Sequence, residues 1–337
     1  MTRRVAISLL TIAGIIVIVF FIVRILPGDG ARLRAGPYAS PERVEAIAER
    51  SGLDDPIGEQ FVNYVGNIAI GSLGISIRTN DRVEEELLRR LPASLELAFY
   101  AVLAATLVGV PLGIWAAAKK GTVVDGGARV FAVLGSSMAL FWLGLLLIYF
   151  LFFRLGWFPG PVDRLPIGTT PPETITGFYT IDALLRGQPG LAVEAFRYLA
   201  LPVITLAFIL AAPILKMVRQ SMIETMDQDH VRTALAMGVP RRRILFVDGF
   251  RNALLPIVTA IGIVFGYMLG GNIIVEFLFS WPGVGRYAYL AIQNNDLDAL
   301  QGFVIMVGVL YVVLNVLIDV VYAWIDPRIR LGGKAAV

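Results

Sequence analysis

The feature that most constrains this chain is a set of six long apolar stretches that contain no charged side chains. Each stretch holds 18 to 24 residues and is continuously apolar rather than alternating. At a rise of about 1.5 Å per residue, such a helix crosses a hydrocarbon core about 30 Å thick. Transmembrane strands would alternate apolar and polar side chains, so the pattern predicts helices. The stretches are residues 5–23, 97–118, 130–153, 198–215, 252–275 and 299–318.

The overall composition excludes the soluble classes of protein. Hydrophobic residues make up 57% of the chain and charged residues 16%, against about 25% charged in an ordinary soluble domain. This excludes a cytosolic enzyme, a disordered chain and a nucleic-acid-binding module. The first stretch is longer than the apolar region of a signal peptide, and no small-residue cleavage site follows it. We therefore expect an integral membrane protein whose first helix is retained.

The basic residues predict the orientation. With six spans and both termini inside, the inside segments carry 15 Lys and Arg in 64 residues, whereas the outside segments carry 14 in 137. Cytoplasmic loops of membrane proteins carry the excess of Lys and Arg. We therefore expect both termini in the cytoplasm. The net charge of +3 reflects this topology and indicates no nucleic-acid partner.

Catalytic and nucleotide-binding motifs are missing from the sequence. There is no cysteine and one histidine, His230, so Cys/His zinc sites and thiolate chemistry are excluded. No P-loop is present, since the Gly333-Lys334 pair is followed by Ala335. Without an energy source of its own, the chain would need partners for active transport.

Two acidic residues adjoin the apolar stretches. Glu96 precedes the second stretch and Asp319 follows the sixth. Ionisable residues inside a bilayer are functional candidates, because burying a charge there is costly. Both lie close to a helix end, which favours a structural or interfacial role. A proton-coupled carrier would place acids nearer the midplane.

The segments between the stretches suggest local structure on both sides of the membrane. Outside, Ser40 and Asp55 each precede a proline, which predicts two helix starts, and the second helix would carry an apolar stripe. These helices would lie on the bilayer or cap the bundle, or else dock an external partner. Residues 154–197 are rich in Pro and Gly, which predicts an ordered loop with few regular elements. Residues 279–286, which include Trp281, are typical of an interfacial anchor, or alternatively of a wall or gate of a pathway. The apolar stripe of the second helix is Ile57, Phe61, Tyr64, Val65 and Ile68.

The largest inside loop is polar but regular. Val231, Ala234 and Leu235 would share one face of a short helix that breaks at residues 238–240. Such a helix could insert into a groove of another subunit. From the residues alone, a solvated loop whose basic side chains only fix topology is the simpler interpretation.

A resemblance to a known family favours the first of these two interpretations. Residues 229–238, followed by Arg-Asn-Ala-Leu-Leu-Pro at 251–256, resemble the coupling loop of ABC-importer permeases, most closely those of the dipeptide and oligopeptide family. The general importer pattern has Glu-Ala-Ala, three residues and Gly. Here Arg232 and Thr233 replace Glu and the first Ala, while Ala234 and Gly238 agree, as in the dipeptide-family variant. Further similar motifs lie at 26–29, 52–56, 91–97, 279–286 and 326–330, and the first of these resembles the "B" type of the paired permeases.

The resemblance implies a fold and a set of partners. The fold would be all-α, a type I (MetI-like) importer permease with six transmembrane helices and a cytoplasmic coupling helix. A second homologous permease would complete the pore, two ABC ATPases would bind ATP and Mg²⁺, and an extracytoplasmic binding protein would deliver the peptide. This chain would hold no cofactor and catalyse no reaction. It would lie in a bacterial or archaeal cell membrane. Contact with an ATPase would involve Asp229, Arg232, Thr233, Ala234, Ala236 and Gly238.

The expected domain organisation follows the topology. Residues 1–26 would form the first helix, 27–91 an extracytoplasmic segment, 92–330 the permease core with its coupling loop at 219–251, and 331–337 a cytoplasmic tail. Relatives of the same class also import nickel chelates, oligosaccharides, opines or glutathione, so these solutes stay open. An autonomous channel or secondary carrier is the alternative from a different class.

Overall fold

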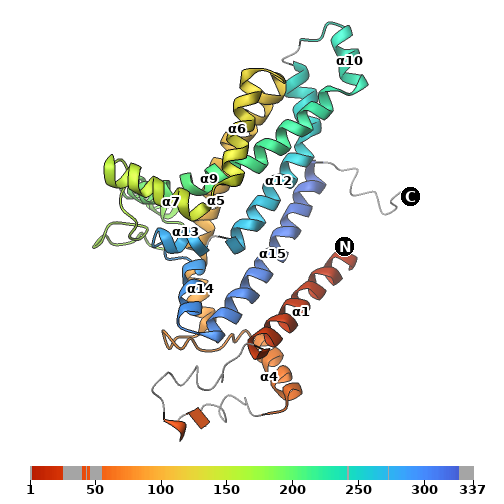
Figure 1. Ribbon diagram of the computed structural model, residues 1–337. Coiled ribbons are helices and arrows are strands. Elements are labelled where there is room, and N and C mark those ends of the chain that lie inside the picture. Colours follow the sequence, from red (N-terminus) through yellow and green to blue (C-terminus); the bar gives the residue numbers. More distant parts are fainter. Residues whose placement is uncertain are drawn as a thin grey trace. The chain divides into compact units, whose positions relative to one another are not determined.

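The computed structural model describes residues 2–25, 40–42, 44–45, 55–240, 243–271 and 273–325 (Figure 1). Within these ranges the regular elements are helices, together with one isolated antiparallel bridge between Ile75 and Arg82. The elements are α1 (Thr2–Ile25), α4 (Ile57–Ala69), α5 (Val83–Ala118), α6 (Val123–Ser137), α7 (Leu140–Leu147), the π-helix η1 (Ile148–Arg154), α8 (Tyr179–Leu185), α9 (Pro189–Met226), α10 (Asp229–Ala236), the π-helix η2 (Ile244–Gly249), α12 (Phe250–Gly271), α13 (Ile273–Leu278), α14 (Val284–Gln293) and α15 (Leu297–Ile325).

The described helices establish a multi-pass membrane protein. Three of them, α5, α9 and α15, are long and apolar enough to cross a bilayer, and α6 with α7–η1 makes a fourth if that bent pair is one span. Shorter apolar helical segments lie at Leu10–Ile22 and Ala253–Met268. Wherever they are described, the six predicted stretches are helical, except at Met138 and Ala139 in the third. The count of six crossings stays a prediction.

The third predicted stretch, 130–153, differs from a simple span. The chain forms α6 up to Ser137, leaves helical geometry at Met138 and Ala139, and resumes as α7–η1 at an angle of 104°. No proline lies here. The Gly-Ser-Ser sequence at 135–137 holds helical geometry weakly, and glycine–serine pairs are known sites of sharp kinks. The stretch is therefore two helices with a corner.

One compact unit comprises Met1–Ser94 and Pro282–Val312. In it, the apolar stripe of α4 packs on α1, where Phe20 meets the rings of Phe61 and Tyr64 at centroid distances of 5.1 and 5.4 Å. The predicted stripe is confirmed except at Ile57, which is exposed. The predicted start of this helix is corrected by one residue. Pro56 itself occupies the cap position, without a side-chain cap hydrogen bond.

The loop before α5 in this unit is held by a buried aspartate. Asp296 accepts a 2.6 Å hydrogen bond from the hydroxyl of Ser76 and is almost fully buried. The first predicted outside helix falls mostly outside the described residues. Its described part is helical, and the amide of Val44 bonds the carbonyl of Ser40 at 3.1 Å.

The second compact unit, Leu95–Trp281 and Val313–Val337, is organised around α9. This helix contacts α6, α7, α8, α12 and α13, and half of its residues are buried. Glycines permit the close approach. A Cβ on Gly113 of α5 would lie 2.7 Å from the Cβ of Val218, and one on Gly135 of α6 would lie 2.9 Å from the Cβ of Ala212. Small residues allow helix backbones to approach closely in membranes.

Two expectations about the outside segments need correction. The segment 154–197 is an ordered loop only between η1 and α8, because α8 is helical and α9 already begins at Pro189. Trp281 is not an exposed interfacial anchor, since only 2% of it is accessible. Its ring is buried within the second unit, where it faces a charged side chain described below.

Candidate functional site

The short helix predicted in the inside loop is present as α10. It extends from the end of α9 after a link of two residues, Asp227 and Gln228 (Figure 1). Val231 is completely buried, whereas Leu235 and Met237 are 45% and 72% exposed. The helix contacts α9 and η2 through its buried side. Its other side therefore presents apolar and charged side chains on the surface of the unit.

Gly238 ends this helix in a left-handed conformation. Its φ is +78°, its amide bonds the carbonyl of Leu235 at 3.0 Å, and the next amide, of Val239, bonds the carbonyl of Ala234 at 3.1 Å. This is a Schellman motif, in which glycine is favoured because it has no Cβ. A Cβ at this position would meet no neighbouring atom. Within this chain the backbone conformation, rather than crowding, explains the glycine.

The remaining predicted coupling residues lie together on α10. Asp229 is fully exposed and lies 3.7 Å from the guanidinium of Arg232, which is 69% exposed. Thr233 donates its hydroxyl to the Asp229 carbonyl at 2.9 Å. Ala234 is half-buried and Ala236 is exposed. Exposed ion pairs contribute little to stability, so these charges are available for an external contact.

Parts of the coupling-loop motif lie outside what the structure describes. These are residues 241–242 and the side chains of His230, Arg251 and Asn252. The motifs at 26–29 and 326–330, and most of that at 52–56, also lie outside the described residues.

A buried ion pair that the sequence analysis missed lies near the same end of α9. Asp125, in the first turn of α6, accepts hydrogen bonds from the Nε and Nη2 atoms of Arg219 on α9 at 2.6 and 3.0 Å. It also accepts the amide of Gly121 at 3.0 Å, and Arg129 lies 3.4 Å away. The hydrogen bond from Arg219, then that from Gly121, lowers the pKa of Asp125 to about 2 and raises the pKa of Arg219. Both groups are charged at neutral pH.

A second buried ion pair joins α5 to the loop after η1. Glu96 is 1% exposed and pairs with the Nη2 atom of Arg164, which is 5% exposed. The other carboxylate oxygen accepts the amide and the hydroxyl of Thr180 at 3.0 and 2.6 Å. This arrangement agrees with the structural role expected for Glu96. Its partner could not be recognised from sequence, because Arg164 lies in an aperiodic loop.

Aromatic rings complete the environment of this arginine. The guanidinium carbon of Arg164 lies 3.4 Å from the ring centroid of Tyr179 and 5.8 Å from that of Trp281. Such rings attract a cation through their negative faces. The adjoining turn is closed by Asp182, which accepts the amides of residues 175–177 and the hydroxyl of Thr176. Burial raises the pKa of Asp182, but these hydrogen bonds outweigh it, so the pKa is below its usual value.

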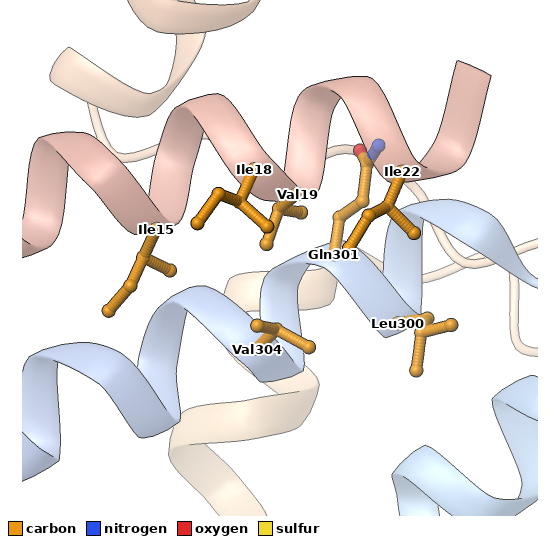
Figure 2. A pocket seen from close by; sticks show the side chains of 7 residues that line it. All are labelled: Ile15, Ile18, Val19, Ile22, Leu300, Gln301 and Val304. Atoms are coloured by element: carbon orange, nitrogen blue, oxygen red, sulfur yellow. The ribbon is translucent and has the colours of Figure 1, made fainter. Parts of the chain in front are cut away.

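A groove between α1 and α15 in the first unit does not resemble a peptide site. Its volume is about 190 Å³. A peptide brings two charged termini and polar amides, which are costly to bury without hydrogen-bond partners. The lining offers one polar side chain among aliphatic ones. The lining residues are Ile15, Ile18, Val19, Ile22, Leu300, Gln301 and Val304 (Figure 2).

Comparison with known proteins identifies similar chains over the full length. The family described as "Binding-protein-dependent transport system inner membrane component" matches residues 109–331, and its N-terminal companion family matches residues 1–98. The chain is 42% identical to the probable D,D-dipeptide transport system permease protein DdpB of Escherichia coli K12, over 96% of this chain and 95% of that protein. It is 38% identical to the dipeptide transport system permease protein DppB of the same strain, over 97% of each chain. It is also 38% identical to the di/tripeptide transport system permease protein DppB of Pseudomonas aeruginosa UCBPP-PA14, again over 97% of each.

Proposed function

Because this chain belongs to the family of inner membrane components of binding-protein-dependent transport systems, we propose that it is the B-type permease subunit of an ATP-driven importer of dipeptides and short oligopeptides. The observation that carries the proposal is the full-length similarity to permeases named for D,D-dipeptides, dipeptides and di/tripeptides. The similarity covers almost the whole of this chain and of each of these relatives, which supports a shared architecture.

The chain would provide half of the translocation pathway. A second homologous permease would provide the other half, and an extracytoplasmic binding protein would deliver the peptide. ATP and Mg²⁺ would be bound and turned over by two cytoplasmic ABC ATPases, while this chain catalyses no reaction. Six crossings with both termini in the cytoplasm would place α10 on the ATPase side, in agreement with the concentration of Lys and Arg there.

The contact with an ATPase would be made by α10. Its buried Val231 holds the helix to the permease, while Arg232, Leu235 and Met237 are exposed. An exposed apolar face beside charged side chains suits a protein–protein contact whose core is apolar and whose rim is polar. Asp229, Arg232, Thr233, Ala234, Ala236 and Gly238 would form or shape this contact. Nucleotide-driven closure of the ATPases would then displace α10 and switch access to the pathway.

Reconstitution tests the function directly. The complete complex is purified from its native membrane, its subunits are identified by mass spectrometry, and it is placed in proteoliposomes with ATP inside and binding protein outside. We expect uptake of radiolabelled Ala-Ala that stops when either ATP or the binding protein is omitted. Uptake by this chain alone would instead establish a channel or secondary carrier.

Competition defines the solute. Unlabelled di- and tripeptides are expected to suppress uptake of labelled Ala-Ala, whereas a nickel chelate, an oligosaccharide and glutathione are not. ATP-dependent uptake of one of these solutes, with no uptake of peptides, would retain the importer class and overturn the peptide assignment.

A further inference from the structure

The link between α9 and α10 is two residues long and is hydrogen-bonded to the end of α9. Helix α9 ends at Met226, and the amides of Asp227 and Gln228 still bond the carbonyls of Ile223 and Thr225 at 3.1 and 3.2 Å. The next residue already belongs to α10. Since the backbone remains hydrogen-bonded through the link, the position of α10 depends on how the end of α9 is held.

The end of α9 is held to α6 by polar contacts on two turns. Arg219 makes its two hydrogen bonds to Asp125, and the ammonium of Lys216 donates to the Ser136 hydroxyl at 2.8 Å. The fork of an arginine on a carboxylate fixes both distance and orientation. Asp125 is 1% exposed, so water competes little for its oxygens.

The turn between α5 and α6 is tied to the same carboxylate. Asp125 accepts the amide of Gly121, and Lys120 of that turn lies 3.5 Å from Asp227 in the α9–α10 link. The second pair is exposed at both ends and contributes little by itself. Asp125 therefore joins the turn after α5, the start of α6 and the last part of α9.

We propose that Asp125 is a positioning residue that clamps the cytoplasmic end of α9, so that α6, α9 and α10 move as one body when an ATPase displaces α10. The inference rests on the proposed function, because it assigns α10 to the ATPase contact. Without the clamp, displacement of α10 would be absorbed by movement of the end of α9 relative to α6. Chains of packed and hydrogen-bonded groups carry coupling between distant sites, and this carboxylate connects two such elements, α6 and α9.

The first test compares transport with ATP hydrolysis in the reconstituted complex. For Asp125→Asn we expect the amount of peptide taken up per ATP hydrolysed to fall about fivefold or more, as loss of one charged hydrogen-bonded contact implies. Arg219→Lys keeps the charge but loses the fork, so it should lower the ratio in the same direction. The matched control is Arg129→Gln, which removes the exposed arginine near the same carboxylate and should leave the ratio unchanged. A loss of assembled complex with an unchanged ratio would overturn the clamp.

The second test measures rigidity directly. The chain contains no cysteine, so no native cysteine has to be removed before labelling. Spin labels can therefore be attached at Val123→Cys of α6 and at Gln228→Cys before α10. Both positions are exposed. We expect one narrow distance distribution that is the same in nucleotide-free and ATP-trapped complexes, and a broader one in Asp125→Asn. If the distance distribution of the protein with Asp125 intact shifted between the nucleotide-free and ATP-trapped complexes, the proposal would be overturned.

The two experiments separate failure of the clamp from failure of the proposed function. Absence of ATP-driven peptide uptake by the wild-type complex refutes the function, whatever the distances show. If the distance distribution between the two spin labels is equally wide in the wild type and in Asp125→Asn, the clamp is refuted even where uptake is normal. The charge exchange Asp125→Arg with Arg219→Asp should restore part of the lost ratio, which an effect confined to one of the two positions would not do.

Discussion

Glu96 and Arg164, 68 residues apart in the sequence, form a buried ion pair within the second unit. The arginine also donates to the carbonyl of Gly177 at 2.8 Å, and the glutamate accepts both donors of Thr180. Hydrogen bonds and an ion pair thus fix the loop between η1 and α8 to α5. A burial of this kind is stable only while both partners are present.

Removal of the arginine should destabilise the protein strongly. Arg164→Gln leaves the carboxylate of Glu96 buried without its counter-charge, which costs about 3–5 kcal/mol. We expect the midpoint of thermal unfolding in detergent to fall by roughly 6 °C or more. Intrinsic tryptophan fluorescence measures this midpoint, since Trp281 lies beside the guanidinium.

The control for this prediction is an exposed arginine close by in the chain. Arg186 pairs with Glu173 at 3.0 Å, but both side chains are largely exposed. Arg186→Gln should therefore change the midpoint by less than about 2 °C. Equal decreases in the unfolding midpoint of the two variants would show that the buried Glu96–Arg164 pair contributes no more to stability than an exposed pair.

The glycine that ends α10 should be sensitive to any side chain. Gly238→Ala forces a Cβ into a left-handed conformation, at about 1–2 kcal/mol, and Gly238→Asn should cost less. Gly238→Trp should abolish peptide uptake while the protein still inserts in the membrane. Uptake assays and membrane fractionation measure the two effects.

Gly126 of α6 provides the comparison. A Cβ there also meets no neighbouring atom, but its backbone is helical. Gly126→Ala should leave uptake unchanged and stabilise the helix slightly. Near-normal transport by Gly238→Trp would contradict the ATPase contact that we propose for α10.

Much of this architecture could be predicted from the sequence, because membranes impose simple rules. Apolar length predicted the helices α5, α9 and α15, and helical periodicity predicted the stripe of α4. The helix α10 and its end at Gly238 followed from local turn chemistry. These features depend on residues close together in the chain, for which composition and spacing carry the information.

The contacts that hold these helices together could not be predicted. Asp125 and Arg219 are 94 residues apart, and nothing in their local sequence indicates a partner. Both lie in segments counted as inside loops, where charges were interpreted as topology signals. The corner at Met138 was missed for a related reason, since apolarity is the same for one straight helix and for two that bend. Long-range pairing and backbone direction leave no periodic signal in a single sequence.

Close packing of α5 on α9 gives a third prediction. In Gly113→Leu, the new Cβ would lie 2.7 Å from the Cβ of Val218 and 3.0 Å from the carbonyl of Leu215, so one helix must shift. Overpacking of this kind costs about 1–3 kcal/mol. We expect a lower unfolding midpoint and lower yield of folded protein, measured by fluorescence-detected size-exclusion chromatography. Gly127→Leu on α6, where a Cβ meets no neighbour, is the control. An equal loss from both would contradict the packing argument.

The last prediction concerns the pH dependence of the Asp125 pair. Its pKa falls from an ordinary 3.8 to about 2 on folding, mainly through the hydrogen bond from Arg219. A carboxyl whose pKa is lowered in the folded state stabilises that state above its unfolded pKa, and this contribution disappears as the pH falls through the folded value. The difference in unfolding midpoint between the wild type and Asp125→Asn should therefore stay constant from pH 7 to about 4.5 and shrink between about pH 4 and pH 2. Lys120→Gln, which removes only an exposed partner of Asp227, should keep the wild-type profile. A difference that already closes between pH 7 and pH 5 would mean that the carboxylate is not held by Arg219 in solution.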